Sequence, residues 1–325
     1  MDSIDQQVLG RVQQWLQHGD DVYLCTIIKA IGSSPRPVGS LLALGPGGAI
    51  SGSLSGGCVE DDLLDRLARR ELAEDGPELV EYGVDAAENE RLGLPCGGRL
   101  YVLVEKLTEQ RLPEIAQIND SLASHQCCQR HLDLASGRSS VHPVDRFEAL
   151  EFDGKQLRQT FGPRYLMLLI GAGQLARTLA EMAMMLDYRI VVCDPRRALI
   201  DDWNLPGVEL SSAMPDDAVR EWVQGPHCIV ITLTHDPRID DMALMEALAS
   251  PAFYVGALGS VRTSAKRRQR LPQLGLSEQQ IDRLHAPVGL SIGSKTPPEI
   301  AVAILAELTR LRRQQWSRGP AGEPA

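Results

Sequence analysis

Two cysteines stand in glycine-rich loops, where a thiol could do chemistry. Cys58 follows Gly56-Gly57 and directly precedes an expected helix, and Cys96 precedes Gly97-Gly98. A thiolate is the reactive form of cysteine and a ligand for soft metals, and a helix N-terminus favours it. The acidic run Glu60–Asp62 in the first helical turn opposes that effect. We expect both thiols to be accessible, with Cys58 as the main metal-binding or sulfur-transferring group and Cys96 assisting.

The remaining cysteines carry weaker signals. The chain has seven cysteines, an odd number, with no Cys-x-x-Cys pair and no Cys/His cluster at the spacing of a structural zinc site. A disulfide framework is therefore not expected. Cys25, Cys193 and Cys228 fall in expected strands and are interpreted as small buried hydrophobic residues. The sequence does not decide between burial and exposure for Cys127 and Cys128.

A nucleotide-binding fingerprint, Gly171-Ala-Gly-Gln-Leu-Ala176, stands between an apolar strand and a helix. Gly171 suits the tight turn, and Gly173 would let the backbone approach a phosphate at the helix N-terminus. Asp194 ends the next expected strand, where an acid normally accepts ribose hydroxyls. Arg196-Arg197 follow it and would suit a 2′-phosphate instead. NAD(P) or another nucleotide is therefore a candidate ligand, and a Rossmann scaffold without redox chemistry is the alternative.

A second candidate group, Thr234-His235-Asp236, follows the expected strand at 229–233 in the same region. Ligands of open α/β sheets usually bind beyond the carboxyl ends of the strands. His235 beside Asp236 could therefore form a proton-transfer pair. The alternative is a loop cap, with Asp236 or Thr234 beginning the next helix.

The elements around the fingerprint predict an α/β fold. Strands are expected at 165–170, 189–193, 229–233 and 253–255, with a helix at 173–186 and others between them. This alternation indicates a Rossmann-type, doubly wound parallel sheet over residues 163–316. The capping box Thr296-Pro-Pro-Glu299 marks the start of the final helix, and residues 317–325 read as a flexible tail.

The first part of the chain predicts a mixed α/β domain at residues 1–107. A helix is expected at 4–16 and another after Cys58, with strands at 22–28, 40–44, 49–53, 79–83 and 99–105. Residues 108–162 are interpreted as a connector, with a helix near 112–123 and a small antiparallel meander turning at Asp153-Gly154.

Charge and hydropathy exclude several classes of partner. The net charge of -10 argues against nucleic acid as a partner. No apolar run approaches the roughly 18 residues that a membrane span needs. The first residues lack the basic and apolar regions of a signal peptide, so a cytoplasmic location is expected.

Several motifs together resemble the XdhC/CoxI family of xanthine dehydrogenase accessory proteins. In the first half they are Gly32-Ser-Ser-Pro-Arg-Pro-Val-Gly39, Ser55-Gly-Gly-Cys-Val-Glu60 and Leu94-Pro-Cys-Gly-Gly-Arg99. In the second half they are Thr234-His-Asp236, Gly256-Ala-Leu-Gly-Ser260, Pro287-Val-Gly-Leu290 and Thr296-Pro-Pro-Glu-Ile-Ala301. One departure is Val261, where many relatives carry arginine; Arg262 follows it.

The resemblance implies a carrier that binds molybdenum cofactor in its molybdopterin form, assists its sulfuration and inserts it into a xanthine dehydrogenase-like molybdenum hydroxylase. A cysteine desulfurase would be a second partner, and a homodimer stays open. Arg36 and the glycine-rich backbone would hold the phosphate or pterin. We expect Cys58, Cys96 and the Gly171–Gly173 loop, with His235 nearby, to line one shared interdomain or intersubunit cleft; the alternative is two separate sites on tethered halves. The alternatives are an NAD(P)-dependent oxidoreductase that uses His235 and a non-catalytic dinucleotide-sensing protein.

Overall fold

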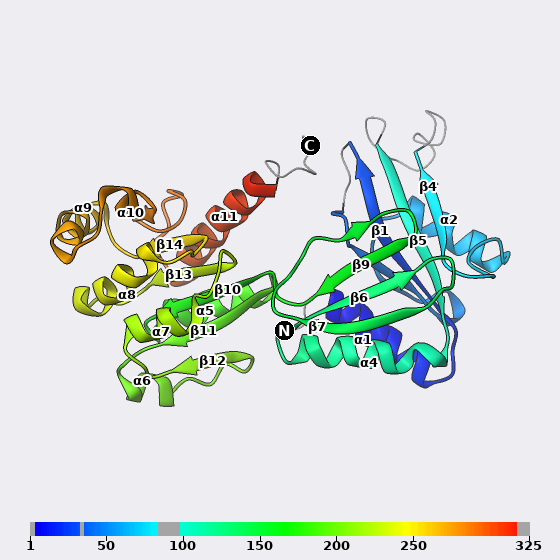
Figure 1. Ribbon diagram of the computed structural model, residues 1–325, viewed down its shortest axis with the longest axis horizontal. Helices are drawn as coiled ribbons and strands as arrows, with labels where there is room; N and C mark the ends of the chain where they lie inside the picture. Colours follow the sequence, from blue (N-terminus) through cyan, green and yellow to red (C-terminus); the bar gives the residue numbers. More distant parts are fainter. Residues whose placement is uncertain (1–3, 33–35, 84–97, 317–325) are drawn as a thin grey trace. The chain divides into compact units, whose positions relative to one another are not determined.

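The chain forms two compact units that meet in the sequence at Gly162 and Pro163. The computed structural model describes residues 4–32, 36–83 and 98–316 (Figure 1). Each unit has its own sheet and its own apolar core, and each is described by itself below.

The second unit is built on a parallel sheet of six strands in the order β12-β11-β10-β13-β14-β15. Its strands are β10 (Tyr165–Ile170), β11 (Tyr188–Cys193), β12 (Val208–Ser211), β13 (Cys228–Thr232), β14 (Tyr254–Ala257) and β15 (Leu284–His285). Every neighbouring pair runs parallel. The strand order reverses direction beside β10, which is where doubly wound sheets bind ligands beyond the carboxyl ends of the strands.

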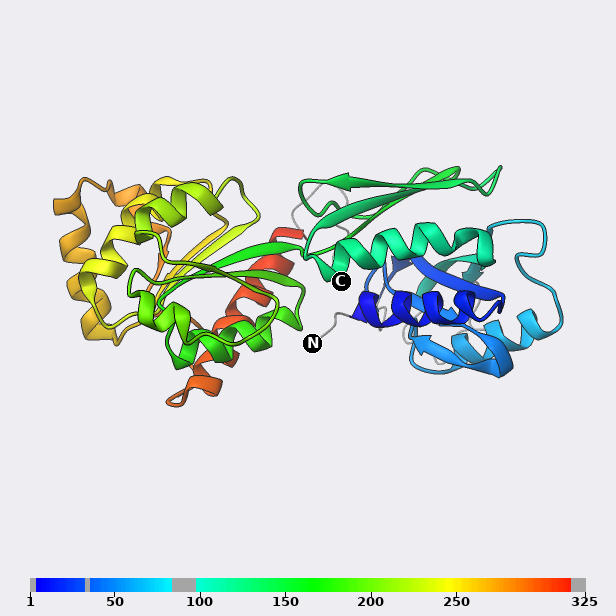
Figure 2. The ribbon, with the colours of Figure 1, turned by 90° about the horizontal axis from the view of Figure 1, so that it is seen from below.

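Helices cover both faces of this sheet (Figure 2). One face packs on α5 (Gln174–Met184) and α11 (Pro297–Trp316), and the other packs on α7 (Pro215–Trp222) and α8 (Pro237–Ala249). The shorter helices are α6 (Arg197–Asp201), α9 (Val261–Arg270) and α10 (Glu278–Asp282), with a 3-10 turn at Leu271–Leu274. The prediction of a Rossmann-type, doubly wound sheet is confirmed.

The first unit contains a five-stranded antiparallel sheet in the order β3-β2-β1-β5-β4. Its strands are β1 (Val22–Ile31), β2 (Leu41–Leu44), β3 (Ile50–Gly52), β4 (Glu78–Tyr82) and β5 (Arg99–Leu107), with a 3-10 turn at Pro46–Gly48. Helix α2 (Cys58–Ala68) buries Val59, Leu63 and Leu67 against one face. That packing fixes the orientation of α2 on the sheet and therefore the position of its first residue, Cys58.

The other face of this sheet is covered by two helices and a second, four-stranded sheet. Helices α1 (Ile4–Gln17) and α4 (Leu112–Ala123) lie side by side, and Asn119 donates to the Leu9 carbonyl (Figure 2). A 3-10 turn at Glu109–Arg111 leads into α4. The second sheet has the order β7-β6-β9-β8 and is antiparallel throughout; its strands are β6 (Cys127–Asp133), β7 (Ser139–Val144), β8 (Glu151–Phe152) and β9 (Gln156–Phe161). Residues 108–162 therefore pack in the same unit as residues 4–107.

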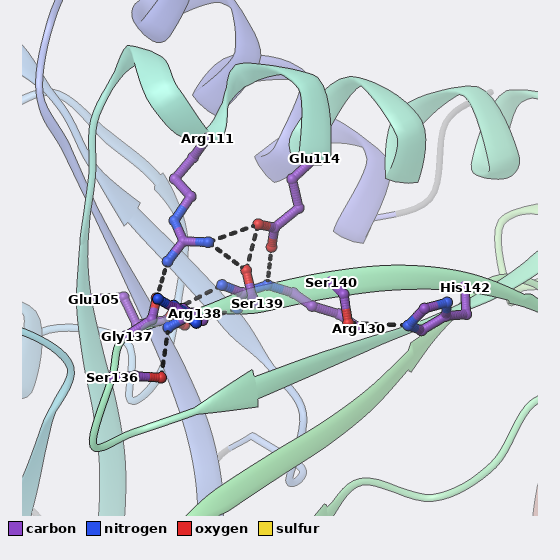
Figure 3. Close-up of polar contacts among 10 residues, drawn as sticks. All are labelled: Glu105, Arg111, Glu114, Arg130, Ser136, Gly137, Arg138, Ser139, Ser140 and His142. Carbon is purple, nitrogen blue, oxygen red and sulfur yellow. Dashed lines mark hydrogen bonds and ion pairs between the residues drawn. The ribbon is translucent and has the colours of Figure 1, made fainter.

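A buried ion cluster joins these layers of the first unit (Figure 3). Arg130 on β6 is 1% exposed and binds Glu105 on β5 through two hydrogen bonds of 2.7 and 2.8 Å. It also donates to Glu114 on α4. The Glu114 carboxylate accepts from Arg111 and Ser139 as well. Because one guanidinium satisfies the buried Glu105 and the partly buried Glu114, it stabilises the contact between both sheets and α4.

Most expected elements agree with the structure, and the differences have physical causes. The expected helix near 112–123 is α4, and Asp153-Gly154 turns between β8 and β9 as predicted. The sheet is not a simple meander, because β9 pairs with β6. Strands β12 and β15 were not predicted; they have four and two residues and carry little periodic signal.

Candidate cofactor-binding loops

The motif loops of the first unit adjoin strands of its five-stranded sheet. Strand β1 ends at Ile31 opposite Arg99, where β5 begins, and β3 ends at Gly52 opposite Leu42, near the start of β2. The Arg36 segment joins β1 to β2, the Cys58 loop follows β3, and the Cys96 segment precedes β5 in the sequence. Leu42 also pairs with Cys25, so β3 ends level with Cys25, six residues before β1 ends at Ile31. Six residues span roughly 20 Å along a strand, so the Cys58 loop leaves the sheet at a different level from the junction of β1 and β5.

The Cys58 loop is folded around a carboxylate. Four consecutive backbone N–H groups, at residues 54–57, donate to Glu60 at 2.8–3.0 Å. The Ser53 hydroxyl donates to it at 2.9 Å, and the Ser55 hydroxyl also donates to it. Burial alone would raise the pKa of Glu60, but the hydrogen bonds from Ser55 and its neighbours outweigh burial and hold the pKa well below its usual range. Glu60 is thus an internal anion at the N-terminus of α2.

This arrangement changes what Gly56 and Gly57 can offer a ligand. Their N–H groups are already donated to Glu60, so in this conformation they are not available to a phosphate. Space is open beside both residues, since a Cβ at either position would meet no atom within 4 Å. Gly56 also has φ +94°, which favours glycine. The two glycines therefore supply close approach rather than hydrogen bonds, and their cofactor-binding role stays a prediction.

Cys58 is the exposed thiol among the cysteines that the structure describes. It is the first residue of α2 and stands next to the open space at Gly57. The cysteines in strands are buried, and burial raises the pKa of Cys193 to about 12. Cys127 and Cys128, which the sequence left undecided, are buried too. Exposure therefore singles out Cys58 within the described ranges.

The structure says less about the other predicted residues of this unit. Cys96 and Gly97 lie outside the described residues. Arg36 is described and exposed. Gly98 is buried, and its Cα would lie 3.4 Å from a Cβ at Gly32, so the backbone after β1 and the backbone before β5 approach closely at these two residues. The binding roles of Arg36, Cys96 and Gly97-Gly98 stay predictions.

In the second unit, the glycine loop lies where the fingerprint requires. Gly171 has φ +110°, and a Cβ there would lie 2.8 Å from Thr234 Cγ2, so only glycine fits. Gly173 is exposed, caps α5 without any side-chain hydrogen bond, and would have no atom within 4 Å of a Cβ. The first N–H groups of a helix need external acceptors. The open space beside Gly173 is compatible with close approach of a phosphate, and the binding role of Gly173 stays a prediction.

Asp194 is held differently from the expected ribose acceptor. Its side chain has no exposed surface, and it accepts from the Ala172 N–H at 2.9 Å. Arg196 binds both carboxylate oxygens, through Nε at 2.8 Å and Nη2 at 2.7 Å. Burial would raise the pKa of Asp194, but the hydrogen bonds from Arg196 and Ala172 lower it. Asp194 therefore ties the glycine loop to β11, and a ribose could reach it only if Arg196 moved.

The Thr234-His235-Asp236 segment follows β13, beside the glycine loop. Asp236 caps α8, accepting from the Arg238 N–H at 3.0 Å and from its guanidinium. This supports the cap interpretation of Asp236 over a proton-transfer pair with His235. His235 is exposed, and its proposed chemistry stays untested. The Thr234 hydroxyl donates to Asp240 at 2.8 Å. Asp240 in turn forms a buried ion pair with Arg267 at 2.8 Å.

Sequence reasoning missed the residues that shape these loops. Glu60 was interpreted only as a charge opposing a thiolate, although its position three residues after Gly57 is that of a capping box. The Asp240–Arg267 pair joins α8 to α9, 27 positions apart, and no local pattern predicts it. Both groups act on backbone position rather than on a ligand.

Two negative findings apply to the described part of the chain. Residues 4–32, 36–83 and 98–316 contain no cluster of three or more His, Cys, Asp or Glu side chains arranged to hold a metal ion. Among the helices in these ranges, none has the length and apolar character needed to cross a bilayer.

Comparison with known proteins assigns the chain to a family. The model of the XdhC and CoxI family matches residues 15–83, and the model of the XdhC Rossmann domain matches residues 167–308. The chain belongs to the XdhC/CoxI family, which confirms the resemblance of its motifs.

Relatives and a solved structure extend the similarity over nearly the whole chain. A probable xanthine dehydrogenase subunit of Bacillus subtilis (strain 168) is 25% identical over 92% of this chain and 96% of its own. The molybdenum cofactor insertion chaperone PaoD of Escherichia coli (strain K12) is 26% identical over 92% and 86%. A crystal structure from Bacillus halodurans, described as a xanthine dehydrogenase, aligns with a TM-score of 0.72 at 25% identity and covers 100% of this chain and 98% of that one.

Proposed function

We propose that this protein binds molybdenum cofactor as cargo, assists its sulfuration and delivers it to a xanthine dehydrogenase-like molybdenum hydroxylase. The family and the names of its relatives support this class of function. The observation that carries the proposal is the exposed Cys58 thiol beside open glycines, at the N-terminus of α2. The protein is then a carrier rather than an enzyme that turns over a metabolite.

The possible metal ligands in the described residues suit a cargo whose metal already carries ligands of its own. The described residues form no protein metal cluster, and molybdopterin supplies a dithiolene to its molybdenum. One soft thiolate from Cys58 would add a contact at the metal end. The phosphate end needs backbone N–H groups, and in the Cys58 loop those of Gly56 and Gly57 are already committed to Glu60.

The sulfuration role assigns one balanced step to Cys58. Its thiolate attacks the outer sulfur of a persulfide on a cysteine desulfurase. A new S–S bond forms on Cys58, the S–S bond of the donor breaks, and the desulfurase cysteine leaves as a thiolate. Exposure of Cys58 is required because two proteins must bring their sulfur atoms into contact.

Replacement of Cys58 tests the proposal. In a reconstituted system with the partner hydroxylase, Cys58→Ala should lower the hydroxylase activity strongly while the thermal unfolding of this protein is unchanged. Asp61→Asn is the matched control, because Asp61 is an exposed residue in the same helical turn. Equal hydroxylase activity with wild type, Cys58→Ala and Asp61→Asn would remove Cys58 from the mechanism.

A further inference from the structure

We propose that Arg196 decides which ligand the Gly171–Gly173 loop accepts, favouring a phosphomonoester over a free ribose diol. The inference rests on the proposed binding of a phosphate-bearing molecule at this loop, and it adds the residue that selects among such molecules. It follows from how Asp194 and Arg196 are placed.

The acid that would bind a ribose is fully engaged. Asp194 has no exposed surface, and its oxygens accept from the Ala172 N–H, from the Arg196 N–H at 3.0 Å and from the Arg196 guanidinium. A diol needs an accessible carboxylate that can accept two hydroxyl protons. As placed here, Asp194 cannot serve NAD in that way.

Arg196 lies beside the glycine loop. Strand β10 lies between β11 and β13 in the sheet. The glycine loop that follows β10 therefore lies between the segments that follow β11 and β13. Arg196 follows β11 and binds Asp194, which accepts from Ala172 in the middle of the loop. Hydrogen bonding to Asp194 raises the pKa of Arg196, and the charge of Asp236, which follows β13, raises it further. The guanidinium is therefore held next to the carboxylate that binds the middle of the loop.

The guanidinium retains capacity to bind an anion. Its side chain is 52% exposed, although its partner is buried. Two of the five N–H donors of the side chain are directed at Asp194. A planar guanidinium binds phosphate oxygens through paired, charge-assisted hydrogen bonds. A dianionic phosphate would therefore be attracted, whereas a neutral diol meets a blocked acid and a cation.

Two sources present this chemistry: the 2′-phosphate of NADPH and the terminal phosphate of a pterin cofactor. Each has a matched partner without the phosphate, namely NADH and a plain pterin alcohol. Fluorescence titration of the full-length protein with NADPH, NADH, 6-(hydroxymethyl)pterin phosphate and 6-(hydroxymethyl)pterin separates the two sources.

We expect wild-type protein to bind the phosphorylated member of at least one pair about 10-fold or more tightly than its partner. Arg196→Ala should abolish that preference and strengthen NADH binding by uncovering Asp194. Arg220→Ala is the control, since Arg220 is an arginine of the same unit whose side chain is also 52% exposed and lies 2.8 Å from Asp217. Arg196→Lys, which keeps the charge, should retain part of the preference if Arg196→Ala proves unstable.

Each outcome decides the inference. A preference confined to the NADPH pair or to the pterin pair supports it and identifies the source. Equal binding within both pairs overturns it. So does a preference that is as strong in Arg196→Ala, or in Arg196→Lys where Arg196→Ala is unstable, as it is in Arg220→Ala. These results are independent of hydroxylase activation through Cys58, so a failure here is distinguishable from a failure of the carrier function.

Discussion

The Cys58 loop and the Gly171–Gly173 loop are both glycine-rich segments that lead from a strand into a helix, yet their backbone N–H groups have different fates. In the first, Glu60 accepts from four consecutive backbone N–H groups at its own helix N-terminus. In the second, Asp194 accepts from one loop N–H, that of Ala172, and the cap at Gly173 stays open.

The difference indicates separate tasks for the two loops. A loop whose donors are satisfied internally is a fixed platform, so the Cys58 loop is suited to present a thiol. A helix N-terminus without an internal acceptor is suited to bind an anion. Glycine content alone does not distinguish these cases; the position of the acidic side chain does.

Removal of the Glu60 carboxylate should give the largest effect on stability. Glu60→Ala leaves several buried or half-buried donors without an acceptor, and we expect a loss of about 3 kcal/mol or more in the first unit. Hydrogen exchange measured by mass spectrometry should show faster exchange at residues 54–63. Asp61→Asn is the control. A loss below about 0.5 kcal/mol would mean that the loop does not depend on Glu60.

The two glycines of the second loop form a matched pair. Gly171→Ala places a Cβ 2.8 Å from Thr234 Cγ2 at φ +110°, so we expect about 2 kcal/mol of destabilisation. Gly173→Ala meets open space at φ -89° and should leave stability within about 0.5 kcal/mol. Urea unfolding checks both values. Similar losses at the two positions would contradict the assignment of Gly171 to a tightly packed turn and Gly173 to an open helix N-terminus.

Asp194 provides a smaller, pH-dependent effect. Because its pKa is lowered in the folded state, its contribution is present above the ordinary aspartate pKa of about 3.9 and is lost as pH falls through the lower folded value. Asp194→Asn should cost about 1 kcal/mol at pH 7, and the difference from wild type should shrink as the pH falls below about 4.

Unfolding curves collected between pH 7 and pH 2.5 would measure this difference. Asp201→Asn, a substitution at an exposed acid, is the control and should show no such trend. A difference between wild type and Asp194→Asn that does not change with pH would refute the role of the Asp194 charge.

The sequence predicted the parallel sheet well because each strand is a short apolar run bounded by turns. Strand β10 was predicted with its observed limits, and β11 and β13 within one residue. The pairing of β6 with β9 could not be predicted, since strands far apart in the chain leave no local signal of their contact. The Glu105–Arg130–Glu114 cluster was missed for the same reason.

The candidate site was predicted in residue types but not in roles. The spacing identified Cys58 and Gly171 through the loops that hold them. The spacing could not show that Glu60 accepts hydrogen bonds from the N–H groups of Gly56 and Gly57. It also could not show that the Arg196 guanidinium binds the Asp194 carboxylate. Both depend on side-chain direction, which composition and spacing do not encode.

The carrier function is tested most directly by the ligand that the protein retains. The full-length chain would be purified without oxygen from cells that make molybdenum cofactor, and its bound molecules measured by mass spectrometry together with its molybdenum content. We predict that molybdenum and a phosphorylated pterin are retained together, and that Cys58→Ala retains less molybdenum than Asp61→Asn. Protein that retains neither, or that retains only a nucleotide, would contradict the proposal that this chain carries molybdenum cofactor.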